Sequence, residues 1–342
     1  MQAFLHINQG VILGKSSWNR TRTIRLSFVL LLLSILESAH AAGITTITIP
    51  AAGAEPALQA VVWTPCAKPA AAMQMGPLTL QGVSECAMTG DALPLIVISH
   101  GKGGTSLSHH DTASALANAG FVVAALSHPG DSLGDDSAAD GLAIFESRTR
   151  DMSRLITFMT KDWKQRAQLK ATAVGVFGFS RGASTALHLI GAVPNVAVSS
   201  QRFCGPWWSF AISMCRQLKA DGAKIRPVAD ARVRAAVVAD PVDLFDASSF
   251  KAVRVPVQLW ASEQGGDGVA LSHVLAIKAQ LTPQPEFHIA KGAGHFAYLA
   301  PCPPALVQSA KQICTDPQGF DRTAWHKQMN VDIASFFQKN LH

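Results

Sequence analysis

The sequence has few charged residues and no strongly basic segment. Asp, Glu, Lys and Arg make up 15% of its 342 residues, against about 25% in a typical soluble domain. The formal net charge is +6, but Lys and Arg form no run with interleaved aromatic side chains, so we expect no nucleic-acid partner. A surface poor in charge is consistent with an exported protein that handles apolar molecules.

Spacings typical of metal sites are also missing. The 6 cysteines and 12 histidines include no C-x-x-C and no H-x-x-x-H pattern, which are common arrangements of metal ligands. The sequence has no internal repeats or low-complexity segments either. We therefore expect no metal and no cofactor.

The cysteines form three couples that are close in sequence, and each couple brackets an expected loop. In an exported chain this arrangement favours disulfides. Among the many pairings that six cysteines permit, the nearest-neighbour choice is the simplest. We expect Cys66–Cys86, Cys204–Cys215 and Cys302–Cys314.

The first residues have the features of a secretory signal peptide. Three arginines precede an apolar run at residues 26–36, and a small-residue cleavage site follows at residues 39–41. The run is too short for a comfortable membrane span. We expect a signal peptide at 1–41 and a periplasmic or secreted mature domain at 42–342 without a stable membrane span; an uncleaved N-terminal anchor is the alternative.

Short apolar runs alternate with segments of helical spacing along most of the mature chain. The expected strands are residues 44–49, 58–64, 95–99, 121–126, the run from Ala173, 233–239, 255–260 and 286–290. The expected helices are 111–119, 144–166, 183–190, 269–281 and 325–341. This alternation predicts an α/β fold with a mostly parallel central sheet and helices on both faces.

Two stretches lack this rhythm. Residues 65–93 are rich in Ala, Gly and Pro and are expected to form a long loop. Residues at about 195–230 are expected to form a small cap-like insertion over the sheet. The aromatic side chains in this insertion either bind substrate or form a buried structural plug: Trp207, Trp208 and Phe210.

The most informative stretch is Gly178-Phe179-Ser180-Arg181-Gly182. It joins a predicted buried strand to a predicted helix, the context that makes a G-x-S-x-G pattern a nucleophile elbow. A serine at such a turn projects its hydroxyl from the sheet edge, next to the backbone N–H groups of the helix N-terminus. Ser180 is therefore the candidate nucleophile; the alternative is a Gly-Ser turn ahead of an ordinary helix.

A serine hydroxyl needs a general base, because it is a weak nucleophile at neutral pH. His295 follows the last predicted strand in a Gly-rich loop and fits this role better than that of a surface-loop histidine. The chain order Ser, acid, His is that of α/β-hydrolases. Three acids between them follow strands and could orient the imidazole: Asp240 first, then Asp267, then Glu263.

The oxyanion of a tetrahedral intermediate needs two backbone N–H donors. Arg181 follows the nucleophile and is expected to supply one. The loop after strand 95–99, residues 100–104, is expected to supply the other from Lys102, unless it is only a Gly-rich turn. Three histidines near this edge lack metal spacing and are expected to be hydrogen-bonded structural residues: His109, His110 and His128.

These motifs together resemble the α/β-hydrolase superfamily, and within it an exported branch labelled predicted dienelactone hydrolases, which is similar to platelet-activating-factor acetylhydrolase and more remotely to cutinase-like polyester hydrolases. The matching pieces are residues 100–104, 127–131, 178–182, 239–241, 292–301 and 320–322. The acetylhydrolase group has its acid at the strand end that corresponds to Asp240, whereas dienelactone hydrolases and cutinases use the following loop, which contains Asp267. True dienelactone hydrolases carry cysteine where this chain has Ser180.

The expected protein is thus an exported serine hydrolase that cleaves small-molecule or lipid-like carboxylic esters through an acyl-enzyme. Cleavage of lactones, thioesters or peptides is an alternative for the same residues. A non-catalytic binding module that retains the fold is another. The sequence does not indicate an oligomeric state.

Overall fold

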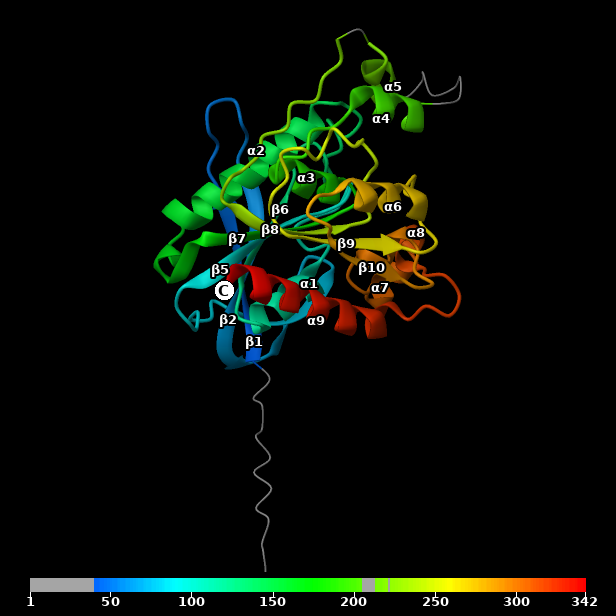
Figure 1. Ribbon diagram of the computed structural model, residues 1–342. Helices are drawn as coiled ribbons and strands as arrows, with labels where there is room; N and C mark the ends of the chain where they lie inside the picture. Colours follow the sequence, from blue (N-terminus) through cyan, green and yellow to red (C-terminus); the bar gives the residue numbers. More distant parts are fainter. Residues whose placement is uncertain (1–39, 205–212, 221) are drawn as a thin grey trace, which may run out of the picture. The chain divides into compact units, whose positions relative to one another are not determined.

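A ten-stranded sheet organises the chain (Figure 1). The computed structural model describes residues 40–204, 213–220 and 222–342, which lie in one unit, Ser38–His342. The strands are β1 (His40–Ile49), β2 (Leu58–Pro69), β3 (Ala71–Met75), β4 (Leu78–Ser84), β5 (Leu93–Ser99), β6 (Val122–Ser127), β7 (Leu169–Phe179), β8 (Val233–Ala239), β9 (Val257–Ser262) and β10 (Glu286–Ala290). Their order in the sheet is β10-β9-β8-β7-β5-β6-β2-β1-β4-β3.

Six strands run parallel and form the part of the sheet that carries the strand-end motifs. β6, β5, β7, β8, β9 and β10 pair in parallel, so their carboxyl ends meet at one edge. β2 pairs antiparallel with both β6 and β1. This arrangement confirms the predicted parallel sheet.

The expectation of a loop at residues 65–93 is wrong over much of its length. β2 continues to Pro69, and β3 and β4 form an antiparallel hairpin, with Met75 paired to Leu78. The Ala- and Gly-rich composition hid the alternation of apolar and polar residues in this hairpin. Gly76 sits at the turn with φ 57°, a conformation that glycine adopts without strain.

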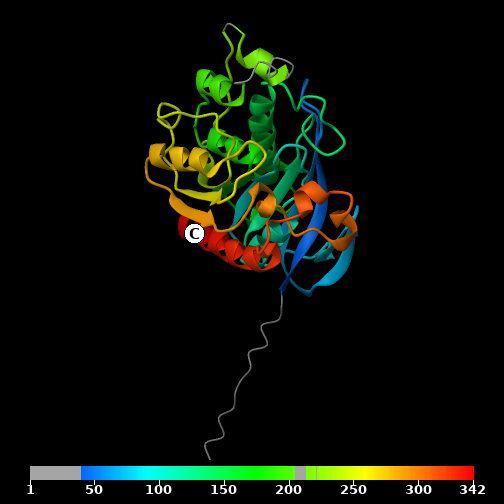
Figure 2. The same cartoon turned by 90° about the vertical axis from the view of Figure 1, so that its right-hand side faces the viewer.

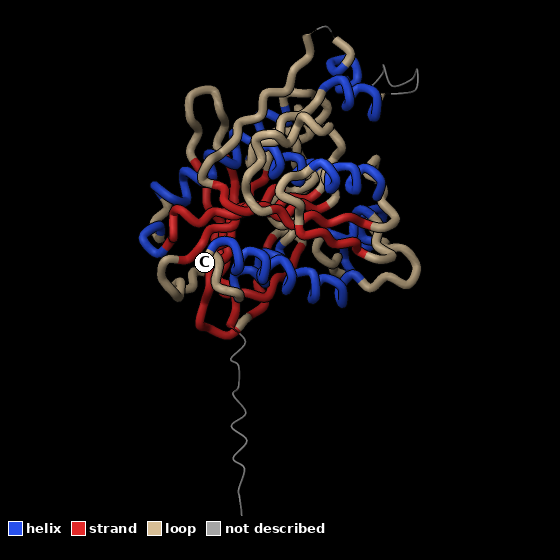
Figure 3. The backbone as a smooth tube through the Cα atoms, viewed as in Figure 1, coloured by secondary structure: helices blue, strands red, loops and turns tan. Residues whose placement is uncertain are grey.

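Helices cover both faces of the sheet (Figure 3). They are α1 (His110–Asn118), α2 (Ile144–Thr157), α3 (Arg181–Leu189), α4 (Val196–Phe203), α5 (Ser213–Leu218), α6 (Leu271–Gln280), α7 (Pro304–Val307), α8 (Lys311–Cys314) and α9 (Arg322–Leu341). Alternate residues of β5 enter two separate cores: Val97 belongs to the cluster that contains residues of α2, α3 and α6, and Ile98 to the cluster that contains residues of α1 and α9. No helix in the described part of the chain is both long and apolar enough to cross a bilayer.

The irregular region after α3 contains α4 and α5, which lie beyond α2 and α3 in two perpendicular views (Figures 1 and 2). Cys204 and Cys215 are disulfide-bonded and join the core on the α2–α3 side. The three aromatic residues proposed to bind substrate lie outside the described residues: Trp207, Trp208 and Phe210.

Three disulfides join the three cysteine couples. Their Cα atoms are 6.0 Å apart in Cys66–Cys86, 5.5 Å in Cys204–Cys215 and 5.6 Å in Cys302–Cys314. Each bond joins cysteines only 11 to 20 residues apart in sequence and so restricts a short segment of the unfolded chain.

Candidate active site

Ser180 sits at a sharp turn between β7 and α3. Its backbone has φ 55° and ψ −120°, a conformation rare for a residue with a side chain. The flanking glycines make the turn possible, because a Cβ on Gly178 would lie 2.1 Å from the carbonyl oxygen of Gly182, and a Cβ on Gly182 would lie 1.9 Å from that of Ser99. The sequence thus forces the serine out of the sheet edge at a point where only glycine fits on either side.

His295 lies against the serine. The distance between its Nε2 and Ser180 Oγ is 3.0 Å. The ring comes from a short 3₁₀ turn that follows β10, and the backbone N–H of His295 donates to the carbonyl oxygen of Gly265 at 2.7 Å. This bond ties the histidine loop to the loop after β9, so the ring position is set by two neighbouring strands.

Asp240 completes a hydrogen-bonded chain. Its Oδ2 lies 3.0 Å from His295 Nδ1. Its Oδ1 accepts from the backbone N–H of Ser262 at 2.8 Å, and its Oδ2 accepts from the Ser262 hydroxyl. Side chains of Asp240 and His295 are almost fully buried, whereas Ser180 retains 6% of its surface. A carboxylate in this position selects the imidazole tautomer with the proton on Nδ1 and leaves Nε2 to accept from the serine.

The structure does not bring the other two candidate acids to the histidine. Glu263 is exposed and binds Lys291 Nζ at 3.0 Å and the backbone N–H of Gly292 at 2.8 Å. Asp267 is exposed in a turn with φ 48°. Both follow β9, one strand beyond the strand that supplies Asp240.

The loop after β5 passes beside the serine. A Cβ on Gly101 would lie 3.3 Å from the Cβ of Ser180. Among the described residues, the backbone N–H groups of Lys102 and Arg181 donate to no acceptor. Neither N–H group is therefore occupied by a hydrogen bond within the described residues, and the assignment of both to an oxyanion hole stays a prediction. The Lys102 side chain points elsewhere and binds Asp140 at 2.8 Å.

A second Ser–His–Asp chain, which the sequence analysis missed, lies buried beneath this loop. His128 Nε2 is 3.0 Å from Ser99 Oγ, and His128 Nδ1 is 3.1 Å from Asp151 Oδ2. Burial and the charges of Arg148 and Arg181 hold the pKa of His128 well below its usual value. Burial raises the pKa of Asp151 to about 6. The His128–Asp151 contact is therefore a hydrogen bond from a neutral imidazole rather than an ion pair.

Asp131 is the charged centre of the same buried region. Its Oδ2 accepts from Arg148 Nη1 at 2.6 Å and from Arg181 Nη1 at 2.8 Å. Arg148 is fully buried, and burial lowers the pKa of its guanidinium to about 10, so it stays charged at neutral pH. The motif at residues 127–131 signalled part of this network, but nothing in the helical spacing of α2 marks Arg148 as buried.

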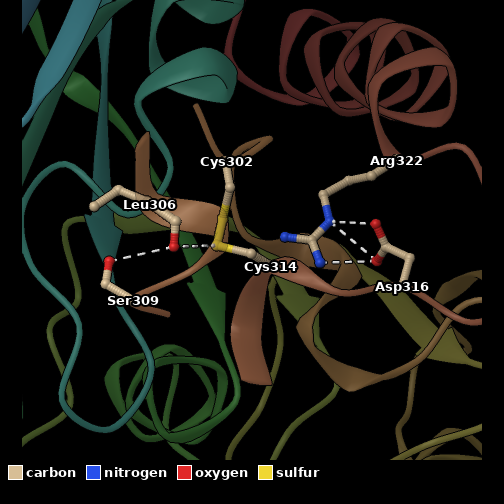
Figure 4. The surroundings of a disulfide bond; sticks show 6 residues. All are labelled: Cys302, Leu306, Ser309, Cys314, Asp316 and Arg322. Atoms are coloured by element: carbon tan, nitrogen blue, oxygen red, sulfur yellow. Dashed lines mark hydrogen bonds and ion pairs between the residues drawn. A yellow bond between two sulfur atoms is a disulfide. The ribbon is translucent and has the colours of Figure 1, made fainter. Parts of the chain in front are cut away.

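A hollow of about 270 Å³ lies beside the loop that carries His295. It is lined by residues 264–266, 294–297 and 315–317. Its outer wall follows the Cys302–Cys314 disulfide and contains Asp316, which binds Arg322 Nη2 at 2.8 Å (Figure 4). The covalent bond and the ion pair fix this wall next to His295.

The described residues contain no cluster of His, Cys, Asp or Glu that could hold a metal ion. His109, one of the three histidines expected to be structural, donates its Nδ1–H to the Tyr298 carbonyl oxygen at 3.0 Å. Burial lowers the pKa of His109 to about 4.

Comparisons with known proteins agree with this architecture. The family described as serine aminopeptidase, S33, matches residues 90–242. No curated protein matches the chain. Among solved structures, the ferulic acid esterase from Streptomyces cinnamoneus superposes with a TM-score of 0.62 at 17% identity, over 90% of this chain and 91% of that chain. The sheet order, the serine turn and these matches show that the chain has the α/β-hydrolase fold.

Proposed function

We propose that this protein is a serine hydrolase that cleaves carboxylic esters. The observation that carries the proposal is the continuous hydrogen-bonded chain from Ser180 through His295 to Asp240, with distances of 3.0 Å on both sides of the imidazole. A hydroxyl, a base and an orienting carboxylate in this order are the parts that nucleophilic acyl transfer requires.

In the proposed reaction Ser180 Oγ attacks the ester carbonyl carbon while His295 Nε2 takes the hydroxyl proton. Asp240 holds the Nδ1 proton and stabilises the imidazolium that forms. The backbone N–H groups of Lys102 and Arg181 bind the oxyanion. His295 then protonates the leaving alcohol, and water attacks the acyl-enzyme with the same residue as base.

The ester class draws support from the fold shared with a ferulic acid esterase and from the resemblance to the dienelactone hydrolase and platelet-activating-factor acetylhydrolase branch. We propose small-molecule or lipid-like esters as substrates and an acyl pocket that includes Trp207, Trp208 and Phe210. If Trp207→Ala and Trp208→Ala leave the acyl-chain preference unchanged, the acyl pocket is elsewhere.

Peptide cleavage is a second candidate, because the family that matches residues 90–242 is described as a serine aminopeptidase. The same nucleophile and base serve amide and ester cleavage. Aminoacyl p-nitroanilides assayed beside p-nitrophenyl esters separate the two, and we expect the esters to be turned over at least tenfold faster.

The deciding experiment is labelling of the purified protein with a fluorophosphonate, followed by peptide mass spectrometry. We expect one label on Ser180 and none in His295→Ala. Folded protein that neither takes the label nor hydrolyses any ester would favour the non-catalytic binding module.

We also propose that residues 1–41 are removed on export and that the mature chain is periplasmic or secreted. The three disulfides support an oxidising compartment. Cleavage after residue 41 would take the first two residues from β1 and leave its pairing with β2 from Ala42 onward intact. N-terminal sequencing of the exported protein tests this assignment.

A further inference from the structure

Asp131 touches both segments that are proposed to bind the oxyanion. It follows β6 and is fully buried. Its Oδ1 accepts the backbone N–H of Gly103 at 3.3 Å, directly after Lys102. Its Oδ2 accepts from the side chain of Arg181 at 2.8 Å, the residue whose backbone N–H is the second donor. One carboxylate thus connects the two N–H groups that must converge on a single oxygen.

The hydrogen bond from Gly103 to Asp131 holds the middle of the loop that carries Lys102. Other hydrogen bonds hold the two ends of this segment, residues 100–104. The backbone N–H of His128 donates to His100 Nε2 at 3.1 Å, and the backbone N–H of Leu133 donates to the Gly104 carbonyl oxygen at 3.1 Å. A turn hydrogen bond from the Gly104 N–H to the Gly101 carbonyl oxygen at 3.2 Å spans the peptide between Lys102 and Gly103, and among the hydrogen bonds of the described residues the Gly103 N–H donates to Asp131 alone.

The Arg181 side chain makes further contacts of its own. Besides Asp131, its Nη1 donates to the Ala139 carbonyl oxygen at 2.8 Å, and its guanidinium lies 5.7 Å above the centre of the Phe145 ring. Arg148 adds a second guanidinium to the same carboxylate oxygen. The carboxylate is therefore compensated in charge, and its position is fixed from two helices, α2 and α3.

We propose that Asp131 positions the oxyanion hole by holding the Lys102–Gly103 peptide and Arg181, the first residue of α3, in fixed positions relative to each other. It is a positioning residue, because it touches neither the nucleophile nor the base. The proposal rests on the serine-esterase function proposed above. Donors that are already aimed at the oxyanion stabilise the transition state without reorganisation, so loosening them lowers kcat more than it raises KM.

The test compares Asp131→Asn with Asp151→Asn in the purified protein. An amide keeps the size of the Asp131 side chain, but its NH₂ group cannot accept from the N–H donors around it. Asp151→Asn removes a carboxylate from the same buried region that contacts neither proposed donor segment. With p-nitrophenyl butyrate, we expect Asp131→Asn to lower kcat by about 10- to 100-fold with KM within about threefold. We expect Asp151→Asn to stay within about twofold of the wild type.

A transition-state analogue gives a readout that a purely structural role would not move. An alkyl trifluoromethyl ketone forms a tetrahedral adduct with the serine, so its inhibition constant should rise in Asp131→Asn by the same factor by which kcat/KM falls. The fluorophosphonate should still label Ser180 to full stoichiometry, at a lower rate. A folded Asp131→Asn with kcat within about twofold of the wild type, or with a loss shared by Asp151→Asn, overturns the proposal.

A second variant covers the case in which Asp131→Asn does not fold, since it leaves two guanidinium groups near a neutral side chain. Arg181→Met removes the hydrogen bond between Asp131 and α3 while keeping the backbone N–H. We expect a loss in kcat of about tenfold, and an unchanged kcat overturns the proposal. Wild-type protein without labelling or hydrolysis would instead overturn the serine-esterase function and this inference with it.

Discussion

Two Ser–His–Asp chains lie side by side in this molecule, and their interatomic distances are nearly the same. In one, His295 is 3.0 Å from Ser180 and 3.0 Å from Asp240. In the other, His128 is 3.0 Å from Ser99 and 3.1 Å from Asp151. Distances alone would rank them equally as catalytic sites.

What separates them is backbone conformation and access. Ser180 sits at a turn with φ 55° and retains 6% of its surface, whereas Ser99 is the last residue of β5 and has none. His128 also faces two guanidinium groups, which oppose the imidazolium that a general base must become. A hydrogen-bonded triad is therefore a candidate site only when the serine is presented to substrate and the histidine can take up a proton.

Replacing the two serines should give the largest contrast. We expect Ser180→Ala to lower kcat/KM for a p-nitrophenyl ester by about 10⁴-fold or more, because the nucleophile is lost. Ser99→Ala should stay within about threefold of the wild type. The melting temperature controls for misfolding. An equal loss of kcat/KM in Ser180→Ala and Ser99→Ala would contradict the assignment of catalysis to the Ser180 site.

The three candidate acids should differ almost as much in their effect on kcat. Asp240→Asn should lower kcat by about 10³- to 10⁴-fold, because an amide no longer favours the productive tautomer of His295. Matched replacements of the exposed acids after β9, Asp267→Asn and Glu263→Gln, should change kcat less than twofold. A large loss in Asp267→Asn would mean that the loop after β9, and not β8, supplies the working acid.

Gly182 in α3 packs against the end of β5, where a Cβ atom would overlap the Ser99 carbonyl oxygen. We expect Gly182→Ala to lower the free energy of unfolding by about 4 kcal/mol, because β5 and α3 would have to separate. Gly141→Ala is the matched control, since a Cβ there would meet its nearest neighbour at 3.5 Å. Denaturant unfolding that shows equal stability for both variants would contradict this packing.

The buried chain should also reveal itself in the pH dependence of stability. The pKa of His128 is lowered on folding, so the folded state binds fewer protons than the unfolded state, and stability falls as the pH drops below about 6.5. The pKa of Asp151 is raised to about 6, so this group opposes the fall below that pH. Asp151→Asn should therefore lose about 1 kcal/mol more than the wild type between pH 6 and pH 5. Denaturant unfolding at the two pH values measures it, and equal losses would place the titration elsewhere.

Local sequence was sufficient to locate Ser180 and His295 at the sheet edge, because glycines and strand ends leave a signature in the chain itself. The contact of Asp240 with His295 was one of three possibilities, because all three acids follow strands and only the tertiary direction of each carboxylate separates them. The hairpin of β3 and β4 was missed because its composition resembles a loop. The burial of Arg148 could not be predicted from the sequence, because it depends on how α2 packs against β5.

The Cys204–Cys215 disulfide has a consequence for protein engineering. It holds the two ends of the intervening segment with Cα atoms 5.5 Å apart and anchors both in the core on the α2–α3 side. Cys204 and Cys215 are thus two fixed points of the insertion, joined by a covalent bond. Libraries that vary residues 205–212 should therefore retain both Cys204 and Cys215.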